Sequence, residues 1–467
     1  MKKPISLLLV LAVLLVSCGT QDRKAKYIFY FIGDGMGTSH VTLAKLYADS
    51  VLNDSNAVSF TQFPVVSHST TYAQNRYITG SAAAGTALSS GTKTSINTIG
   101  LTYDRTDTLY SIAKKFKEAG RKVAILTSVS IDHATPAAFY AHVGHRDNYY
   151  EIAKQLPKSN YDFFASGGFL EPNGSKSDSG AVSIYELGKH YGYHFTTSLT
   201  GVDSLVAAGA KSVVYSAPNS ASGSALQYEI DRSPSDVTLA DITRKAIDVV
   251  DNPNGFFIMV EGGKIDWAAH DNDAATVIHD VLAFARAVDV AIDFYSKHPN
   301  ETLIVVTADH ETGGLSVGNR ENKYDVHVNL LQYQKVSKER LHKLVSDFQL
   351  QNPKAKFADL LSLLAENTGL SKEIELTDAD IQMLMEAYNY VFKSSQSPET
   401  TTYSETDPIS RVAIQILNSK AAIGWTTGSH TAQPVPVFTI GCGQEHFTPM
   451  LDNTDIPKMI LRSAALR

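Results

Sequence analysis

Six short runs of apolar, β-branched and aromatic residues recur along the chain. The runs are continuous rather than alternating, which is typical of strands buried on both faces of a sheet. Amphipathic segments lie between them; in residues 108–119, Leu109, Ile112 and Phe116 share one helical stripe, and Gly120 ends the pattern. The alternation predicts an α/β fold: a three-layer α/β/α sandwich around a large, mostly parallel central sheet. The expected strands are residues 27–32, 123–127, 212–215, 256–260, 302–307 and 435–440.

Residues 320–406 interrupt this alternation. Three helical patterns, at 339–348, 358–368 and 378–392, follow one another without an apolar run between them. We interpret the segment as a cap or insertion in one large catalytic domain that extends over residues 26–467. Because it contains no dense cluster of candidate metal ligands, we expect the chemistry to lie elsewhere.

The first residues have the pattern of an export signal. A basic start is followed by an apolar run that is too short to span a bilayer, and the run ends in Leu-Val-Ser-Cys. This ending resembles a bacterial lipobox, so we expect a lipoprotein signal peptide at 1–17, a lipid on Cys18 and a tether at 18–25. Ordinary cleavage nearby, with Cys18 incidental, is the alternative. Both predict export, and the absence of an acidic run after Cys18 favours anchoring on the periplasmic side of a membrane.

Composition narrows the classes of protein further. Of 467 residues, 43% are hydrophobic and 19% charged, as in ordinary globular proteins. The formal net charge of -7 does not indicate a nucleic-acid partner. Cys18 and Cys442 are the two cysteines of the sequence, and a lipid on Cys18 would exclude an intramolecular disulfide.

Acidic residues follow three of the expected strands. Asp34, Glu261 and Asp309 stand at or just after strand ends, and His310 comes next to the last of them. One such acid commonly caps a helix or a turn. Three are better explained by the crevice at the carboxyl ends of parallel strands, where they would attract cations. Asp266 and His270, spaced i,i+4, add a carboxylate and an imidazole on one helix face, a pair that suits zinc but alone is more often a surface contact.

A run of small residues at 79–88 predicts a helix that starts near Ser81. Free backbone N–H groups and the helix dipole would bind an anion there and favour an ionised seryl oxygen. A structural N-cap serine is the alternative, and by itself the commoner one.

Taken together, these motifs resemble the alkaline phosphatase family from about residue 26 to the C-terminus. The resemblance covers six ordered motifs at 31–37, 79–91, 133–146, 261–270, 309–310 and 429–431. It implies an alkaline phosphatase-like fold and hydrolysis of phosphate monoesters, with Ser81 as the nucleophile that forms a phosphoserine and Arg146 binding two nonbridging phosphate oxygens. The implied metals are two Zn²⁺ and one Mg²⁺. Their ligands would be Asp266, His270 and His430 for one zinc, Asp34, Asp309 and His310 for the other, and Asp34, Thr135 and Glu261 for magnesium.

Three positions depart from the family's usual pattern. Gly80 stands where an aspartate often helps to orient the arginine, so we expect Arg146 to be less firmly oriented and to bind phosphate more weakly. His133 is a possible third-site residue. Trp267 stands where a lysine or histidine commonly approaches phosphate; it either packs at the pocket or stacks on an aromatic leaving group.

Two rival functions remain at this stage. The first is a phosphodiesterase or sulfatase of the same superfamily, although the sequence around Ser81 lacks the proline and arginine of a sulfatase motif. The second is a lipoprotein that binds phosphate esters with a decayed catalytic apparatus, although every expected ligand is present. Small phosphorylated substrates are the expected partners, and a homodimer stays open because family members commonly dimerise.

Overall fold

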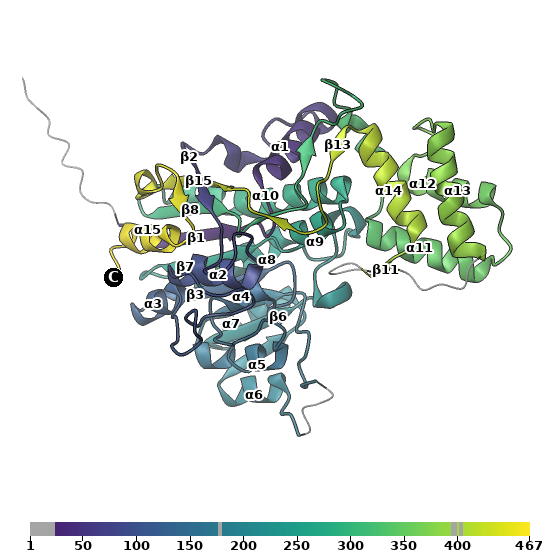
Figure 1. The fold of residues 1–467 in the computed structure, drawn as a ribbon. Helices are drawn as coiled ribbons and strands as arrows, with labels where there is room; N and C mark the ends of the chain where they lie inside the picture. Colours follow the sequence, from purple (N-terminus) through teal and green to yellow (C-terminus); the bar gives the residue numbers. More distant parts are fainter. Residues whose placement is uncertain (1–23, 176–179, 394–398, 401–404) are drawn as a thin grey trace, which may run out of the picture.

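The computed structural model describes residues 24–175, 180–393, 399–400 and 405–467, and a ten-stranded sheet crosses its centre (Figure 1). The expected signal peptide and Cys18 lie outside the described residues. All six predicted strands are present, as β1 Tyr27–Ile32, β3 Lys122–Thr127, β6 Ser212–Ser216, β7 Phe256–Glu261, β8 Thr302–Thr307 and β15 Val435–Gly441. Four further strands of this central sheet were not predicted: β2 Val65–Thr70, β4 Phe163–Ser166, β5 Tyr193–Thr196 and β16 Leu451–Asp452.

The sheet is mostly parallel, as predicted. Its order is β16-β2-β15-β8-β1-β7-β3-β4-β6-β5, and the seven strands from β8 to β5 pair in parallel. The exception is β15, which is antiparallel to both β8 and β2. The central strand β1 is buried along its whole length because its neighbours and the covering helices exclude water from both faces.

Helices cover the two faces of the sheet, which completes the predicted three-layer sandwich. Phe29 and Phe31 of β1 belong to one hydrophobic cluster and Ile28, Tyr30 and Ile32 to a second, since alternate residues of a strand face opposite sides. The first cluster includes residues of α1 Thr38–Tyr47, α8 Leu239–Val250 and α10 Ala274–Lys297; the second includes residues of α2 Ser81–Ser90, α3 Ile112–Glu118 and α15 Asp455–Ser463. Shorter helices are α4 Ala134–Ala137, α5 Tyr149–Ala153, α6 Ile184–His190, α7 Leu199–Ala207 and α9 Lys264–His270.

The helix expected at 108–119 is shorter than its hydrophobic stripe suggested. It begins at Ile112, because the Ser111 side chain accepts a hydrogen bond from the Lys114 N–H and caps the helix. Leu109 therefore lies outside the helix. The prediction was wrong about the first turn and right about the apolar face that Ile112 and Phe116 bury.

The segment expected to be an insertion is a helical lobe at one end of the molecule, drawn in green in Figure 1. It contains α11 Lys338–Gln351, α12 Phe357–Thr368 and α13 Asp378–Lys393, all three packed against α14 Pro408–Lys420. Their positions match the three helical patterns of the sequence. Among the described residues, none of the helices combines the length and the apolar character that a membrane span requires.

Candidate active site

The three strand-end acids meet at one edge of the sheet. Asp34 follows β1, Glu261 ends β7 and Asp309 follows β8, and β1 lies between β7 and β8 in register. All three side chains are fully buried. The parallel pairing brings them together at the carboxyl ends of neighbouring strands, as the sequence predicted.

Asp34, Asp309 and His310 form the first cluster. The His310 Nε2 atom lies 3.5 Å from Asp34 Oδ1 and 3.2 Å from Asp309 Oδ2. One ligand atom from each residue can approach a common point, as a bound cation requires. This is the set that the resemblance implied for the second zinc.

Asp266, His270 and His430 form an adjoining cluster. Nε2 of His270 lies 3.4 Å from Asp266 Oδ2 and 3.1 Å from His430 Nε2, which is itself 3.7 Å from Asp266 Oδ1. Asp266 and His270 come from α9, whereas His430 enters from β14 His430–Thr431, which pairs antiparallel with β9 Glu311–Thr312. This antiparallel pairing of strands that are far apart in sequence brings His430 to the ends of the parallel strands.

The histidines of these clusters are oriented by second hydrogen bonds. His270 Nδ1 lies 2.6 Å from the Gly428 carbonyl oxygen, and His430 Nδ1 lies 2.9 Å from that of Thr79. A carbonyl oxygen only accepts, so each Nδ1 carries the proton and each Nε2 presents a lone pair to the cluster. Both rings are therefore in the tautomer that binds metal.

Glu261 and Asp34 also belong to a third group, with Thr135 and His133. Thr135 Oγ1 donates to Asp34 Oδ2 over 3.4 Å, and His133 Nδ1 lies 3.9 Å from Glu261 Oε1. A cation could be shared by Asp34, Glu261 and His133. Thr127 ends the neighbouring strand β3, and its hydroxyl donates to Glu261. The sequence analysis did not predict this residue, although its position at the end of an expected strand was a signal for it.

Ser81 is the first residue of α2 and is fully buried. Gly80, not Ser81, is the N-cap, so a purely capping role for the serine is excluded. The Ser81 hydroxyl lies 3.4 Å from His310 Nε2, which places it against the first cluster.

Arg146 reaches the same place from the loop before α5. Its Nη2 lies 2.9 Å from His133 Nε2. Burial raises the pKa of Asp34 and lowers that of His310, and the charge of Arg146 lowers both pKa values. His133 thus holds the guanidinium in this protein. At Gly80 an added Cβ would make ordinary contacts with Ile96 and His430, so a side chain could begin there without a clash.

Buried oxygens show that these clusters fit divalent cations. Asp34 Oδ1, Glu261 Oε1, Asp266 Oδ2 and Asp309 Oδ2 are buried and have no hydrogen-bond partner among the described residues. Burial raises the pKa of Asp34 well above its usual range, that of Glu261 to about 8 and that of Asp309 to about 7. Grouped anionic oxygens of this kind are costly unless they are protonated or coordinate a metal.

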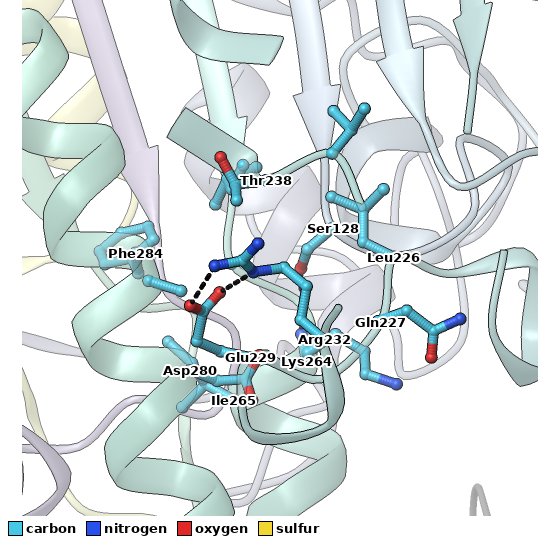
Figure 2. Close-up of a pocket in the computed structure, with 14 residues that line it drawn as sticks. Ser128, Leu226, Gln227, Glu229, Arg232, Thr238, Lys264, Ile265, Asp280 and Phe284 are labelled. Carbon is cyan, nitrogen blue, oxygen red and sulfur yellow. Dashed lines mark hydrogen bonds and ion pairs between the residues drawn. The ribbon is translucent and has the colours of Figure 1, made fainter. Parts of the chain in front are cut away.

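The Trp267 side chain packs against its neighbours rather than projecting into open space. The side chain is 6% exposed, and its ring lies edge-on to the His133 ring. The buried Lys264 ammonium lies 3.4 Å from the centre of the Tyr228 ring and 4.8 Å from that of Trp267. Lys264 also lines the separate pocket of Figure 2, with Asp280 and the Glu229–Arg232 ion pair. Little indole surface is left for a leaving group, so the geometry favours the packing interpretation.

Comparison with known proteins agrees with this geometry. The family model described as alkaline phosphatase matches residues 25–164 and 192–466. Alkaline phosphatases 3 and 4 of Bacillus subtilis are 31% and 30% identical to this chain, with 95% and 96% of it and 90% of each relative covered. The solved structure of a cold-active alkaline phosphatase from the psychrophile Shewanella sp. matches with a TM-score of 0.76 at 26% identity, covering 94% of this chain and 99% of that one.

A parallel sheet whose strand ends gather carboxylates and imidazoles around a helix-start serine defines a metal-dependent phosphoester hydrolase. Within that class the chain belongs to the alkaline phosphatase family, and it is a phosphomonoesterase.

Proposed function

We propose that this protein hydrolyses phosphate monoesters through a phosphoserine on Ser81, at a centre that holds two Zn²⁺ and one Mg²⁺. The observation that carries the proposal is the position of the Ser81 hydroxyl, buried at the start of α2 and 3.4 Å from a ring nitrogen of the first cluster. Asp34, Asp309 and His310 would hold one zinc, and Asp266, His270 and His430 the other. Asp34, Glu261 and Thr135 would hold magnesium, with His133 beside them.

The chain's own residues prepare the nucleophile and the phosphoryl group. Unpaired N–H groups and the dipole at the start of α2 favour negative charge on the Ser81 oxygen and on a phosphoryl group in front of it. The Arg146 fork would bind two nonbridging oxygens, and His133 fixes its direction. When bound, the cations would supply Lewis acidity that lowers the pKa of the hydroxyl and of water and neutralises the leaving oxygen.

The reaction then has two displacements at phosphorus. The Ser81 oxygen attacks in line, the bond from phosphorus to the ester oxygen breaks, and the alcohol leaves after taking up a proton. Water next gives up a proton and attacks the phosphoserine from the vacated side; the bond from phosphorus to the Ser81 oxygen breaks, that oxygen takes up a proton, and inorganic phosphate leaves. Charge stays on the nonbridging oxygens in both steps, which is where a bidentate guanidinium is most effective.

The proposal also covers the location of the protein and its oligomeric state. The basic, apolar and Cys-containing start supports export and a lipid on Cys18, with the catalytic part on the periplasmic side of a membrane. A homodimer is the assembly that the family resemblance favours. Mass spectrometry of the mature N-terminus and light scattering of the purified protein test the two statements separately.

The choice between a monoesterase and its rivals is tested with three matched substrates: nitrophenyl phosphate, bis-nitrophenyl phosphate and nitrophenyl sulfate. We expect kcat/KM for the monoester to exceed that for either other substrate by at least about 100-fold, since a dianionic group with three nonbridging oxygens matches Arg146 and the clusters, whereas the diester has two such oxygens and one charge, and the sulfate has one charge. A diester turned over as fast as the monoester would favour the phosphodiesterase. If none of the three substrates is turned over, the decayed binding protein is favoured.

Metal affinity should depend on pH in a defined direction. In the metal-free protein Asp309, with a pKa of about 7, and Glu261, with a pKa of about 8, hold protons that a cation must displace. Affinity should therefore rise from pH 6 to pH 8, with proton release detectable by calorimetry in buffers of different ionisation enthalpy. Both folded pKa values lie above the unfolded ones, so the free energy of unfolding of the metal-free protein should fall over the same pH range. Equal affinity at both pH values would contradict this.

A further inference from the structure

The hydroxyl group of Thr312 lies between the first cluster and the adjoining one. Thr312 ends β9, is fully buried and pairs in register with His430 of β14. Its hydroxyl donates to Asp266 Oδ1 over 2.5 Å and lies 3.2 Å from His310 Nδ1. Asp266 belongs to the adjoining cluster and His310 to the first, so a single oxygen atom contacts a candidate ligand of each.

The single proton of this hydroxyl sets the direction of both hydrogen bonds. A carboxylate that binds a cation is ionised and only accepts, so the proton of Thr312 points to Asp266. The Thr312 oxygen is then left to accept, and His310 Nδ1 has to be the donor. The lone pair of His310 is therefore on Nε2, which lies 3.2 Å from Asp309 Oδ2 and 3.4 Å from the Ser81 hydroxyl.

His310 differs from the other two histidines of the clusters in the kind of acceptor that orients it. Those two rings have backbone carbonyl oxygens at Nδ1, of Gly428 and Thr79, and these are present whatever the side chain of the residue is. For His310 the acceptor is the side chain of Thr312. A single substitution can therefore remove the group that orients this ring.

The same hydroxyl orients the carboxylate of Asp266. Oδ1 accepts the bond from Thr312, and Oδ2 lies 3.4 Å from His270 Nε2. Gly35 leaves room for this contact: its φ is +70°, and an added Cβ would lie 2.8 Å from both Thr312 Oγ1 and Asp266 Oδ1. The Gly35 carbonyl oxygen also accepts from the Thr312 N–H over 3.1 Å. Gly35 thus places Thr312 and allows it to approach Asp266.

We propose that Thr312 is a positioning residue that orients His310 and Asp266 together and so links the affinities of the two clusters for Zn²⁺. It acts through these two ligands rather than on the substrate. The inference rests on the proposed function, because it takes both clusters to hold zinc. Removing an outer partner of a metal ligand typically costs about 10–100-fold in metal affinity. Since both clusters share this hydroxyl, its removal should weaken zinc binding at both.

Zinc affinity is the first test. Thr312→Val keeps the shape of the side chain and removes its hydroxyl, whereas Thr312→Ser keeps the hydroxyl. Zinc titrations of the metal-free proteins, with Mg²⁺ present and a chromophoric chelator as competitor, measure the affinity of each zinc site. The valine variant should lose at least about tenfold in affinity at both sites, and the serine variant should retain wild-type affinity. Unchanged affinity in the valine variant, or weakening at one site alone, overturns the proposed link.

A spectroscopic signature separates this role from a general loss of packing. With zinc bound, the Nδ1–H proton of His310 should give a downfield resonance in protein that carries isotope-labelled histidine, identified by its absence in His310→Asn. The resonance should move upfield in Thr312→Val and keep its position in Thr312→Ser, because only the valine lacks the acceptor oxygen. Equal positions in the wild type and the valine variant overturn the hydrogen bond. If Thr312→Val does not fold, Thr312→Ala replaces it in both measurements.

Thr243→Val is the matched control. Thr243 is fully buried in α8, and its hydroxyl donates to the Leu239 carbonyl oxygen over 2.7 Å rather than to a cluster ligand. This variant also loses a buried hydroxyl, but its zinc affinities and the His310 resonance should match those of the wild type. Equal weakening of zinc in both valine variants overturns the assignment to Thr312. An active, zinc-binding wild type with unchanged affinities in Thr312→Val contradicts this inference alone, whereas a wild type that binds no zinc contradicts the proposed function as well.

Discussion

Replacing Ser81 by alanine should lower kcat for phosphate monoesters by at least about 10³-fold, because the substitution removes the nucleophile and leaves only the cation clusters and Arg146 to activate water. The same substitution should abolish labelling of the chain. Wild-type protein mixed with labelled phosphate or substrate and quenched in acid should yield phosphoserine in the peptide that contains Ser81, and the variant should yield none.

Ser90→Ala is the matched control for this experiment. Ser90 ends the same helix, and its hydroxyl donates to the Thr86 carbonyl oxygen away from the clusters. Its variant should keep full labelling and activity. A Ser81→Ala protein that turns over monoesters as fast as the wild type would show that a different group attacks phosphorus.

The second large effect is expected on removal of metal. A chelator should abolish activity and lower the thermal unfolding midpoint, since the buried carboxylates of Asp34, Asp266 and Asp309 would lose their compensating charge. A ligand present at 1,000 times its Kd stabilises a fold by about 4 kcal/mol, so the shift should be readily measured by calorimetry. Zn²⁺ with Mg²⁺ should restore both properties, and neither ion alone should restore them fully.

Asp309→Asn separates a metal effect from general damage by the chelator. The amide keeps the shape of the side chain and removes its charge, so the variant should lose at least about 100-fold in activity, because even outer partners of metal ligands cost 10–100-fold. Its unfolding midpoint should respond less to the chelator than that of the wild type. Asp347→Asn, an exposed acid of α11 in the helical lobe, should match the wild type in both measurements. An active wild type after exhaustive chelation, with no metal found by elemental analysis, would exclude a catalytic cation.

Ser81 and the metal clusters are positioned by different parts of the fold. Ser81 is placed by local structure, because a run of small residues starts a helix directly after an extended Gly80. The clusters are placed by the order of the strands, because β1 lies between β7 and β8. Loss of Ser81 should therefore leave the fold stable, whereas loss of metal should affect stability and activity together.

The sequence by itself determined the features that depend on near neighbours. Continuous apolar runs defined six of the ten strands of the central sheet, and acids at three strand ends predicted where the candidate ligands meet. The four missed strands are short or lie toward the edges of the sheet, where one polar face weakens the apolar signal; β2, for example, alternates buried and exposed residues and carries His68 and Thr70. The helix at 108–119 was overextended because hydrophobic spacing does not show that Ser111 caps it.

Only the tertiary structure decided the features that join distant parts of the chain. The pairing of β14 with β9 brings His430 to Asp266. The fold also gives Arg146 the His133 ring as a partner, and it sets Lys264, three residues before Trp267, against the ring of Tyr228. The physical reason is that periodicity reports how one element faces the core, whereas a site between elements depends on long-range packing that no local pattern encodes.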